Sequence, residues 1–401
     1  MLYNIQFLRF IAAMLVVLYH SAAQLPVNDS VFQAVFSAGE SLGFAGVDIF
    51  FVISGFIMAH TASSQSGSAM SYDFARRRLA RIFSGYWPFF VLAVVIFGYY
   101  RAEHFADSNL LKSFFLWPQS LNHILLEITW TLSYELYFYL LFSLLILLTT
   151  PRNRNGFVLL AFVLLLVLNI YRHFIAHSYS PENIYYLGFW SQFLTAPFLL
   201  EFFGGALVAG WLQKRPTGPA LSWFLTGTFL FLAGGWINES VYSGLIEQGF
   251  HVVPRVFVYG LPACMLLMGL VRLERNADEV KPTNGALPVS KADETSTGHR
   301  VALRAPVRFS ALAGGSSYAI YLSHILILTV AWNNGFNQLI ASWSGIMIIA
   351  AYLVLMLSIL GYSMLHYVLL EKPLHQLFKK WIGLHQAQPQ GRNHGTGIKA
   401  D

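Results

Sequence analysis

The sequence predicts an all-α, polytopic membrane protein with about ten transmembrane helices. Of the 401 residues, 56% are hydrophobic and only 11% are charged, which is about half the charged share of a soluble domain. Apolar runs of about 20 residues, the length that crosses a bilayer, recur along nearly the whole chain. The single cysteine, Cys264, excludes an internal disulfide framework and a thiolate metal cluster, and we expect no metal.

Apolar runs between polar interruptions mark the predicted spans. They lie at 7–23, 42–60, 83–100, 131–149, 157–172, 193–211, 221–238, 256–271, 309–332 and 344–370. Lysine and arginine concentrate in alternate loops, on the side that carries both termini. The positive-inside rule therefore predicts that both termini are cytoplasmic, as in a multi-pass protein of a bacterial inner membrane. This topology explains the net charge of +6 without a nucleic-acid partner, and the basic face suits anionic membrane lipid.

Residues 1–384 are predicted to form one transmembrane domain. Residues 273–307 are rich in proline, glycine, serine, threonine and charge, and the tail 385–401 is polar. Both are predicted to be disordered cytoplasmic segments.

Ionisable residues inside a membrane are costly and are candidates for function. Arg9 and His20 lie on one face of the first span, about 16 Å apart, which places them in opposite thirds of the membrane. Asp48 opens the second span at a depth similar to His20, where its carboxylate can orient the imidazole as a general base. The alternatives are that Arg9 reaches lipid phosphates, that His20 is an interfacial residue, and that Asp48 caps its helix.

Four arginines in YDFARRRLARIFSGYW, including Arg78 and Arg81, follow the second span. They can bind the phosphates of a nucleotide-like cofactor or act only as a positive-inside anchor. Glu135, in TWTLSYELYFY, is predicted to lie about one turn inside the outer boundary of the membrane. Its predicted role is acid/base catalysis, binding of a hydroxyl group or a structural pair. Ser317, Tyr321 and His324 form one polar stripe on the ninth span.

Together these residues resemble the acyltransferase family 3 membrane proteins, which O-acetylate bacterial surface glycans. The resemblance runs from Arg9 to LEKPLHQLF near the C-terminus. It rests on the spacing of Arg9 and His20 and on GVDIFFVISGFIM, the arginine-rich loop, WTLSYELYFY and SYAIYLSH, in that order. The WTLSYE form is most similar to the exopolysaccharide-production branch.

The resemblance implies an O-acetyltransferase with an acyl-CoA donor, expected to be acetyl-CoA, on the cytoplasmic side. The implied acceptor is a glycan hydroxyl, and the glycan can be lipid-linked. It also implies that His20 is essential, with Arg9 as its motif partner, and that Arg78 and Arg81 match the family's loop arginines. Ser84 stands where the family commonly has proline, which puts the geometry of the loop in question.

Residues and resemblance together give one predicted site. The predicted catalytic residues are His20, Arg9, Asp48, Glu135 and His324, and the predicted donor-binding residues are Arg78, Arg81 and Arg9. A secondary transporter of a small anionic solute is the main alternative. It predicts inverted repeats and broken helices in matching halves of the chain, and the sequence shows neither. A second alternative is a non-catalytic sensor or scaffold, which would give Arg9 and His20 no function.

Overall fold

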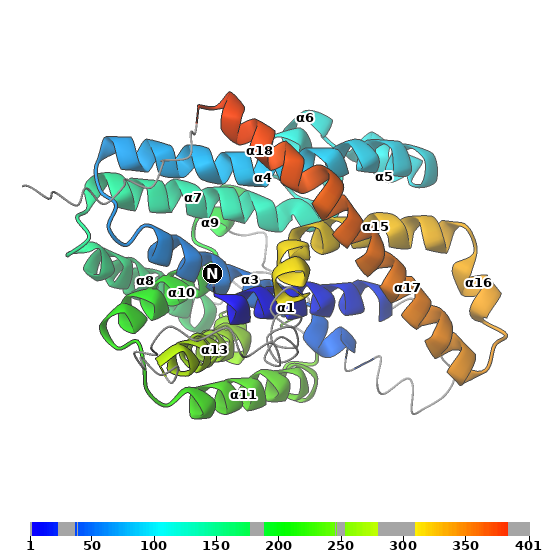
Figure 1. Ribbon diagram of the computed structural model, residues 1–401. Helices are drawn as coiled ribbons and strands as arrows, with labels where there is room; N and C mark the ends of the chain where they lie inside the picture. The colour runs from blue at the N-terminus through cyan, green and yellow to red at the C-terminus, as the bar shows by residue number, and fades with distance from the viewer. Residues whose placement is uncertain are drawn as a thin grey trace, which may run out of the picture.

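The structure is a computed structural model, which describes residues 2–22, 37, 39–176, 188–244, 246, 253–279 and 309–383. Every regular element within these residues is helical (Figure 1). Nine helices there are long and apolar enough to cross a membrane, and ten do so if a bent pair is counted as one span. The predicted fold class, an all-α protein with about ten membrane helices, is confirmed.

The helices fall into a long and a short group. The long ones are α1 (Tyr3–Ala22), α3 (Gly46–Thr61), α4 (Ser68–Tyr100), α7 (Trp130–Leu148), α8 (Arg154–Ile170), α10 (Phe198–Lys214), α11 (Ala220–Ser240), α13 (Leu261–Glu279), α15 (Ser317–Asn333) and α17 (Gly345–His366). The short ones are α5 (Ala102–Asp107), α6 (Leu110–Phe114), α9 (Phe189–Leu194), α16 (Phe336–Ile340) and α18 (Lys372–Trp381). Short 3₁₀ and π-helical turns complete the set: η1 (Leu121–His123), η2 (Glu127–Thr129), η3 (Tyr171–Ile175), η4 (Val256–Gly260) and η6 (Tyr367–Glu371).

Helix α1 runs through the middle of the bundle and packs against α3, α13 and α15. On one side of it α4 packs against α7 and α15, and α18 crosses α4 (Figure 1). The outermost helices expose apolar side chains, as Leu159, Leu164 and Val167 of α8 do. Because the surrounding solvent is lipid, the interior of the bundle is where polar side chains can be gathered.

Helices α3 and α10 approach each other most closely at two glycines. A Cβ atom at Gly55 would collide with the backbone carbonyl of Phe202, and a Cβ atom at Gly205 with that of Val52. Small residues allow this contact between membrane helices. The pair fixes α3, which carries one wall of the site described below.

We expect Gly205→Ala to lower the free energy of unfolding by about 1–3 kcal/mol, because its methyl group must force α3 and α10 apart. Thermal melting of the detergent-purified protein measures this effect. Gly361→Ala is the matched control, since a Cβ atom there meets no other atom within 4 Å. Equal melting temperatures for the two variants would contradict the close contact.

Two predicted boundaries differ from the structure. The third span was predicted to begin at residue 83, but α4 begins at Ser68, so the arginine cluster lies on a helix rather than in a loop. Helix α13 continues to Glu279, so the first residues of the predicted disordered segment 273–307 are helical. The rest of that segment and the tail 385–401 lie outside the described residues.

The ninth span is broken at Ser316. The pieces Phe309–Gly315 and Ser317–Asn333 meet at an angle of 55°. At the break, Cβ atoms on Gly314 and Gly315 would collide with Gln6 and with Tyr367, so both glycines are needed for close packing. The break places the first residue of α15 beside α1. One bent pair within the described residues is not the set of broken helices in matching halves that a transporter predicts.

Candidate functional site

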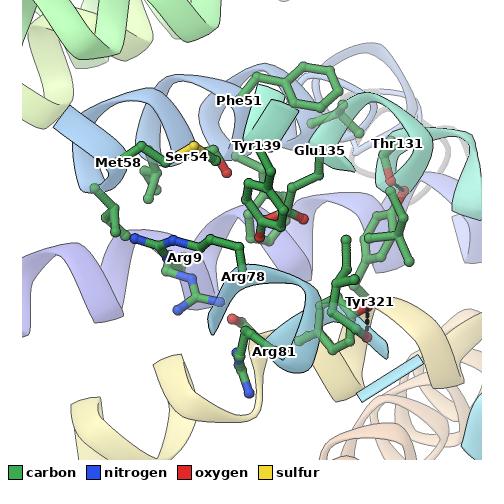
Figure 2. A pocket seen from close by; sticks show the side chains of 18 of the residues that line it. Arg9, Phe51, Ser54, Met58, Arg78, Arg81, Thr131, Glu135, Tyr139 and Tyr321 are labelled. Carbon is green, nitrogen blue, oxygen red and sulfur yellow. Dashed lines mark hydrogen bonds between the residues drawn. The ribbon is translucent and has the colours of Figure 1, made fainter. Parts of the chain in front are cut away.

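A cavity of about 270 Å³ lies inside the bundle, between α1, α3, α4, α7 and α15. Three of its lining residues are arginines and one is a glutamate. In Figure 2 the side chains of Arg9, Arg78, Glu135 and Tyr139 gather around the same space. The predicted residues Arg9, Arg78, Arg81 and Glu135 are therefore brought together. We call this space the arginine cavity.

The four arginines of α4 differ in what they contact. Arg76 and Arg77 pair with Asp73 of their own helix. Arg78 and Arg81, one turn apart, line the arginine cavity instead. The two arginines that the family resemblance selected, Arg78 and Arg81, are thus the two of this cluster that line the cavity. Ser84, where a proline was expected, lies inside α4 and does not interrupt it.

The three guanidiniums are unequally paired. Arg81 Nη1 donates to Glu371 Oε1 at 2.6 Å, and the Glu371 side chain is fully buried. Arg78 donates a hydrogen bond of 2.9 Å to the neutral hydroxyl group of Thr61. Arg9 makes only a long contact of 3.5 Å with the Gln6 side chain. Within the described residues neither Arg78 nor Arg9 forms an ion pair, so the cavity has positive charge available for an anion.

Glu135 stands in the second turn of α7, which begins at Trp130. It accepts a hydrogen bond of 2.5 Å from the hydroxyl of Tyr139, one turn further on, and Tyr139 lies beside Arg78, 6.0 Å from its guanidinium. Glu135 is therefore part of the arginine cavity, whereas His324 does not line it.

The break at Ser316 directs the start of α15 to the same cavity. Ser317, the first residue of α15, lines it. Tyr318 of the same turn lies under Arg81, with 5.7 Å between the guanidinium and the ring.

His20 and His324 form a contact that the sequence did not predict. His324 Nε2 lies 3.3 Å from His20 Nδ1, and the rings are 5.1 Å apart. His20 Nδ1 also contacts the carbonyl of Val16 at 2.9 Å, and His324 Nδ1 contacts that of Ile320 at 3.2 Å. A carbonyl can only accept a hydrogen bond, so in the neutral rings both Nδ1 atoms carry the proton. His20 Nε2 is then unprotonated and is able to act as a base.

The polar stripe of α15 links the two groups of residues. Ser317 and Tyr321 line the arginine cavity, and His324, one turn beyond Tyr321, contacts His20. The rings of Tyr321 and His324 are 6.0 Å apart. Arg9 and His20, on one face of α1, stand about 16 Å apart alongside this stripe. A site for an anionic group and a candidate base thus lie along one line through the bundle.

Asp48 does not contact His20, and that prediction is corrected. Both oxygens of Asp48 accept hydrogen bonds of 2.8 Å from Arg255, which follows α11 and precedes η4. The pair is buried, with side-chain exposures of 0% and 3%, and Arg255 also lies over the rings of Phe44 and Phe198. Asp48 therefore contacts Arg255 and not the predicted neighbour.

Three residues that line the cavity, and Glu371, which pairs with Arg81, were missed by the sequence reasoning. Tyr139 had a signal, because it lies one helical turn after Glu135. Glu371 was counted as a loop residue at the end of the last span, although it directly follows the apolar residues YVLL. Gln6 and Tyr318 had no signal beyond lying one turn or less from predicted residues, Arg9 and Ser317.

The family model described as an acyltransferase domain matches residues 2–365. One curated relative is the exopolysaccharide production protein ExoZ of Rhizobium meliloti (strain 1021). It is 28% identical over 332 residues, which cover 79% of this chain and 89% of the relative. No solved structure matches the chain. The matched region contains α1, α3, α4, α7 and α15, which build the arginine cavity and the histidine contact, and the chain belongs to the acyltransferase 3 family of membrane proteins.

Proposed function

We propose that this membrane acyltransferase transfers an acetyl group from acetyl-CoA to a hydroxyl of an exported glycan, in a bacterial inner membrane. The observation that carries the proposal is the arginine cavity, where Arg9 and Arg78 have no anionic partner within the described residues. Guanidiniums are well suited to phosphate because they bind it through two parallel hydrogen bonds. The named role of the relative, exopolysaccharide production, supports a glycan as the acceptor.

The residues fit a phosphate-bearing thioester. A cavity of about 270 Å³ is at the lower limit for a drug-sized ligand, so it suits one end or the narrow arm of the donor rather than the whole molecule. Arg78 and Arg81 would hold phosphate oxygens, and Arg9 would guide the arm along α1 toward His20. Because α1 and α4 both carry these arginines toward the side predicted to be cytoplasmic, the donor would enter from the cytoplasm.

The chemistry proposed for His20 is general base catalysis. Nε2 of His20 takes the proton of the acceptor hydroxyl, and the hydroxyl oxygen forms a bond to the thioester carbonyl carbon. The carbon–sulfur bond then breaks, and the thiolate of CoA recovers the proton from His20. His324 acts as a positioning residue, because its Nε2 accepts from His20 Nδ1. Glu135 would help to place the donor in the arginine cavity.

The test compares Arg78→Ala with Arg77→Ala in membranes supplied with radiolabelled acetyl-CoA. We expect Arg78→Ala to raise KM for acetyl-CoA about tenfold to a hundredfold, the effect of losing a charged hydrogen bond of about 1.5–3 kcal/mol. Arg77 is the matched control because it lies one residue away and pairs with Asp73. Label in the glycan is counted as a function of donor concentration. Equal KM values for the two variants, or no label from acetyl-CoA in the native membranes, would contradict the proposal.

A further inference from the structure

A second cavity, of about 540 Å³, lies apart from the arginine cavity and shares no lining residue with it. Its lining comes from residues 107–123, which follow the end of α4, and from the start of α9. Since Arg78 and Arg81 are in the first half of α4, the second cavity is at the opposite end of that helix. In the predicted topology this end faces the outside of the cell.

One part of the second cavity is aromatic. Trp117 and Trp190 both line it, with exposed fractions of 56% and 48%. Their ring centroids are 6.2 Å apart and their planes are at 80°, so the rings form two walls of a corner. Leu116 has a φ of 53°, a left-handed conformation that is strained for leucine. This turn buries Leu116 and leaves the next side chain, Trp117, facing the cavity.

The other part is polar. Asp107, Asn109, Lys112 and Gln119 line the same space. The Gln119 side chain donates through Nε2 to Ser113 at 3.1 Å, but its buried Oε1 atom has no hydrogen-bond partner in the described part of the chain. The carboxylate, amide and ammonium groups that line this part can pair with the hydroxyls of a ligand.

The second cavity is held rigidly on α4. Tyr86 donates to the carbonyl of Ser113 at 2.7 Å, and Trp87 donates to that of Phe114 at 3.2 Å. The Ser113 hydroxyl in turn accepts from the backbone N–H of Leu125 at 3.0 Å. Residues on both sides of Trp117 are thus fixed to the same helix that carries the donor arginines. Such support preorganises a binding surface.

Aromatic rings beside a carboxylate and amides match the chemistry of a sugar. The C–H face of a sugar ring packs on an indole, and its hydroxyls pair with carboxylate, amide and ammonium groups at the edge. The rings of an aromatic belt at a membrane surface, by contrast, lie against lipid headgroups and need no cavity lined by polar groups. We propose that the second cavity binds sugar residues of the acceptor glycan. This inference rests on the proposed function and adds the place where the acceptor is held.

The first test measures glycan binding to the full-length protein in detergent. The probe is a mixture of end-labelled oligosaccharides, prepared by cleaving the polysaccharide that the producing cells export. We expect Trp117→Ala and Trp190→Ala each to weaken binding about tenfold, as truncation of a central aromatic contact does, and Trp117→Phe to retain most of it. Trp236→Ala is the control, because Trp236 is an exposed tryptophan (68%) on α11. Native-like binding by both alanine variants, or no binding by the native protein, would overturn the inference.

The second test separates the acceptor site from the donor site. Trp117→Ala is expected to raise KM for the glycan about tenfold and to leave KM for acetyl-CoA unchanged, the reverse of Arg78→Ala. The binding test uses no acyl donor, so it tests glycan binding by the second cavity even if acetyl-CoA is not the donor. If the tryptophan variants lose folded protein while the remaining protein binds glycan normally, the rings belong to the lipid interface and the inference is wrong.

Discussion

His20→Ala is expected to lower the rate of acetyl transfer to glycan by about 10²–10⁴-fold, the contribution of a general base. KM for acetyl-CoA should stay near the native value, since the arginine cavity that would hold the donor does not include His20. The measurement is label transfer from acetyl-CoA at saturating donor, with the amount of protein in the membranes determined in parallel. Native activity in His20→Ala membranes that contain normal protein would contradict a base at this position.

His324 provides a graded comparison. His324→Ala removes the ring whose Nε2 lies 3.3 Å from His20 Nδ1, so His20 loses one partner and keeps the carbonyl of Val16. We expect a loss of about tenfold in rate, smaller than that of His20→Ala, because one neutral hydrogen bond is worth about 1 kcal/mol. His60→Ala is the control. His60 lies in the last turn of α3, where its ring stacks on that of Phe56. If His324→Ala were as inactive as His20→Ala, His324 would be a catalytic residue itself.

Helix periodicity explains which parts of the site could be predicted. It gives the depth of a residue in the membrane and the helix face on which it lies. That was enough to place Arg9 and His20 on one face of α1 and to align Ser317 with His324, whereas Arg78 and Arg81 were chosen only by the family resemblance. It was also enough for the number of spans, because apolar length alone marks them.

Periodicity does not say which helices become neighbours. Arg81 pairs with Glu371, 290 positions away along the chain, and Asp48 pairs with Arg255, 207 positions away. Both partners come from helices that the bundle brings alongside only after it has assembled. Depth alone suggested that Asp48 faces His20, whereas the packing of α3 against η4 turns it to Arg255.

Asp48→Ala is expected to cost about 3–5 kcal/mol of stability, because it leaves the guanidinium of Arg255 buried without its partner. The same range is expected for Arg255→Ala, which leaves the carboxylate unpaired. Both variants should yield much less folded protein in the membrane, measured by size-exclusion chromatography of detergent extracts. Normal amounts of folded protein in either variant would contradict a buried ion pair.

The double variant Asp48→Leu/Arg255→Met decides between a structural and a catalytic role for Asp48. Replacing both members of a buried pair by apolar residues of similar size is often neutral or stabilising, so we expect folded protein to return to near the native amount. A structural pair predicts that acetyl transfer returns with it, since His20 keeps its contacts with Val16 and His324. A carboxylate that orients His20 predicts folded but inactive protein, because the double variant still lacks it. Restored folding without restored transfer would therefore return Asp48 to the catalytic residues.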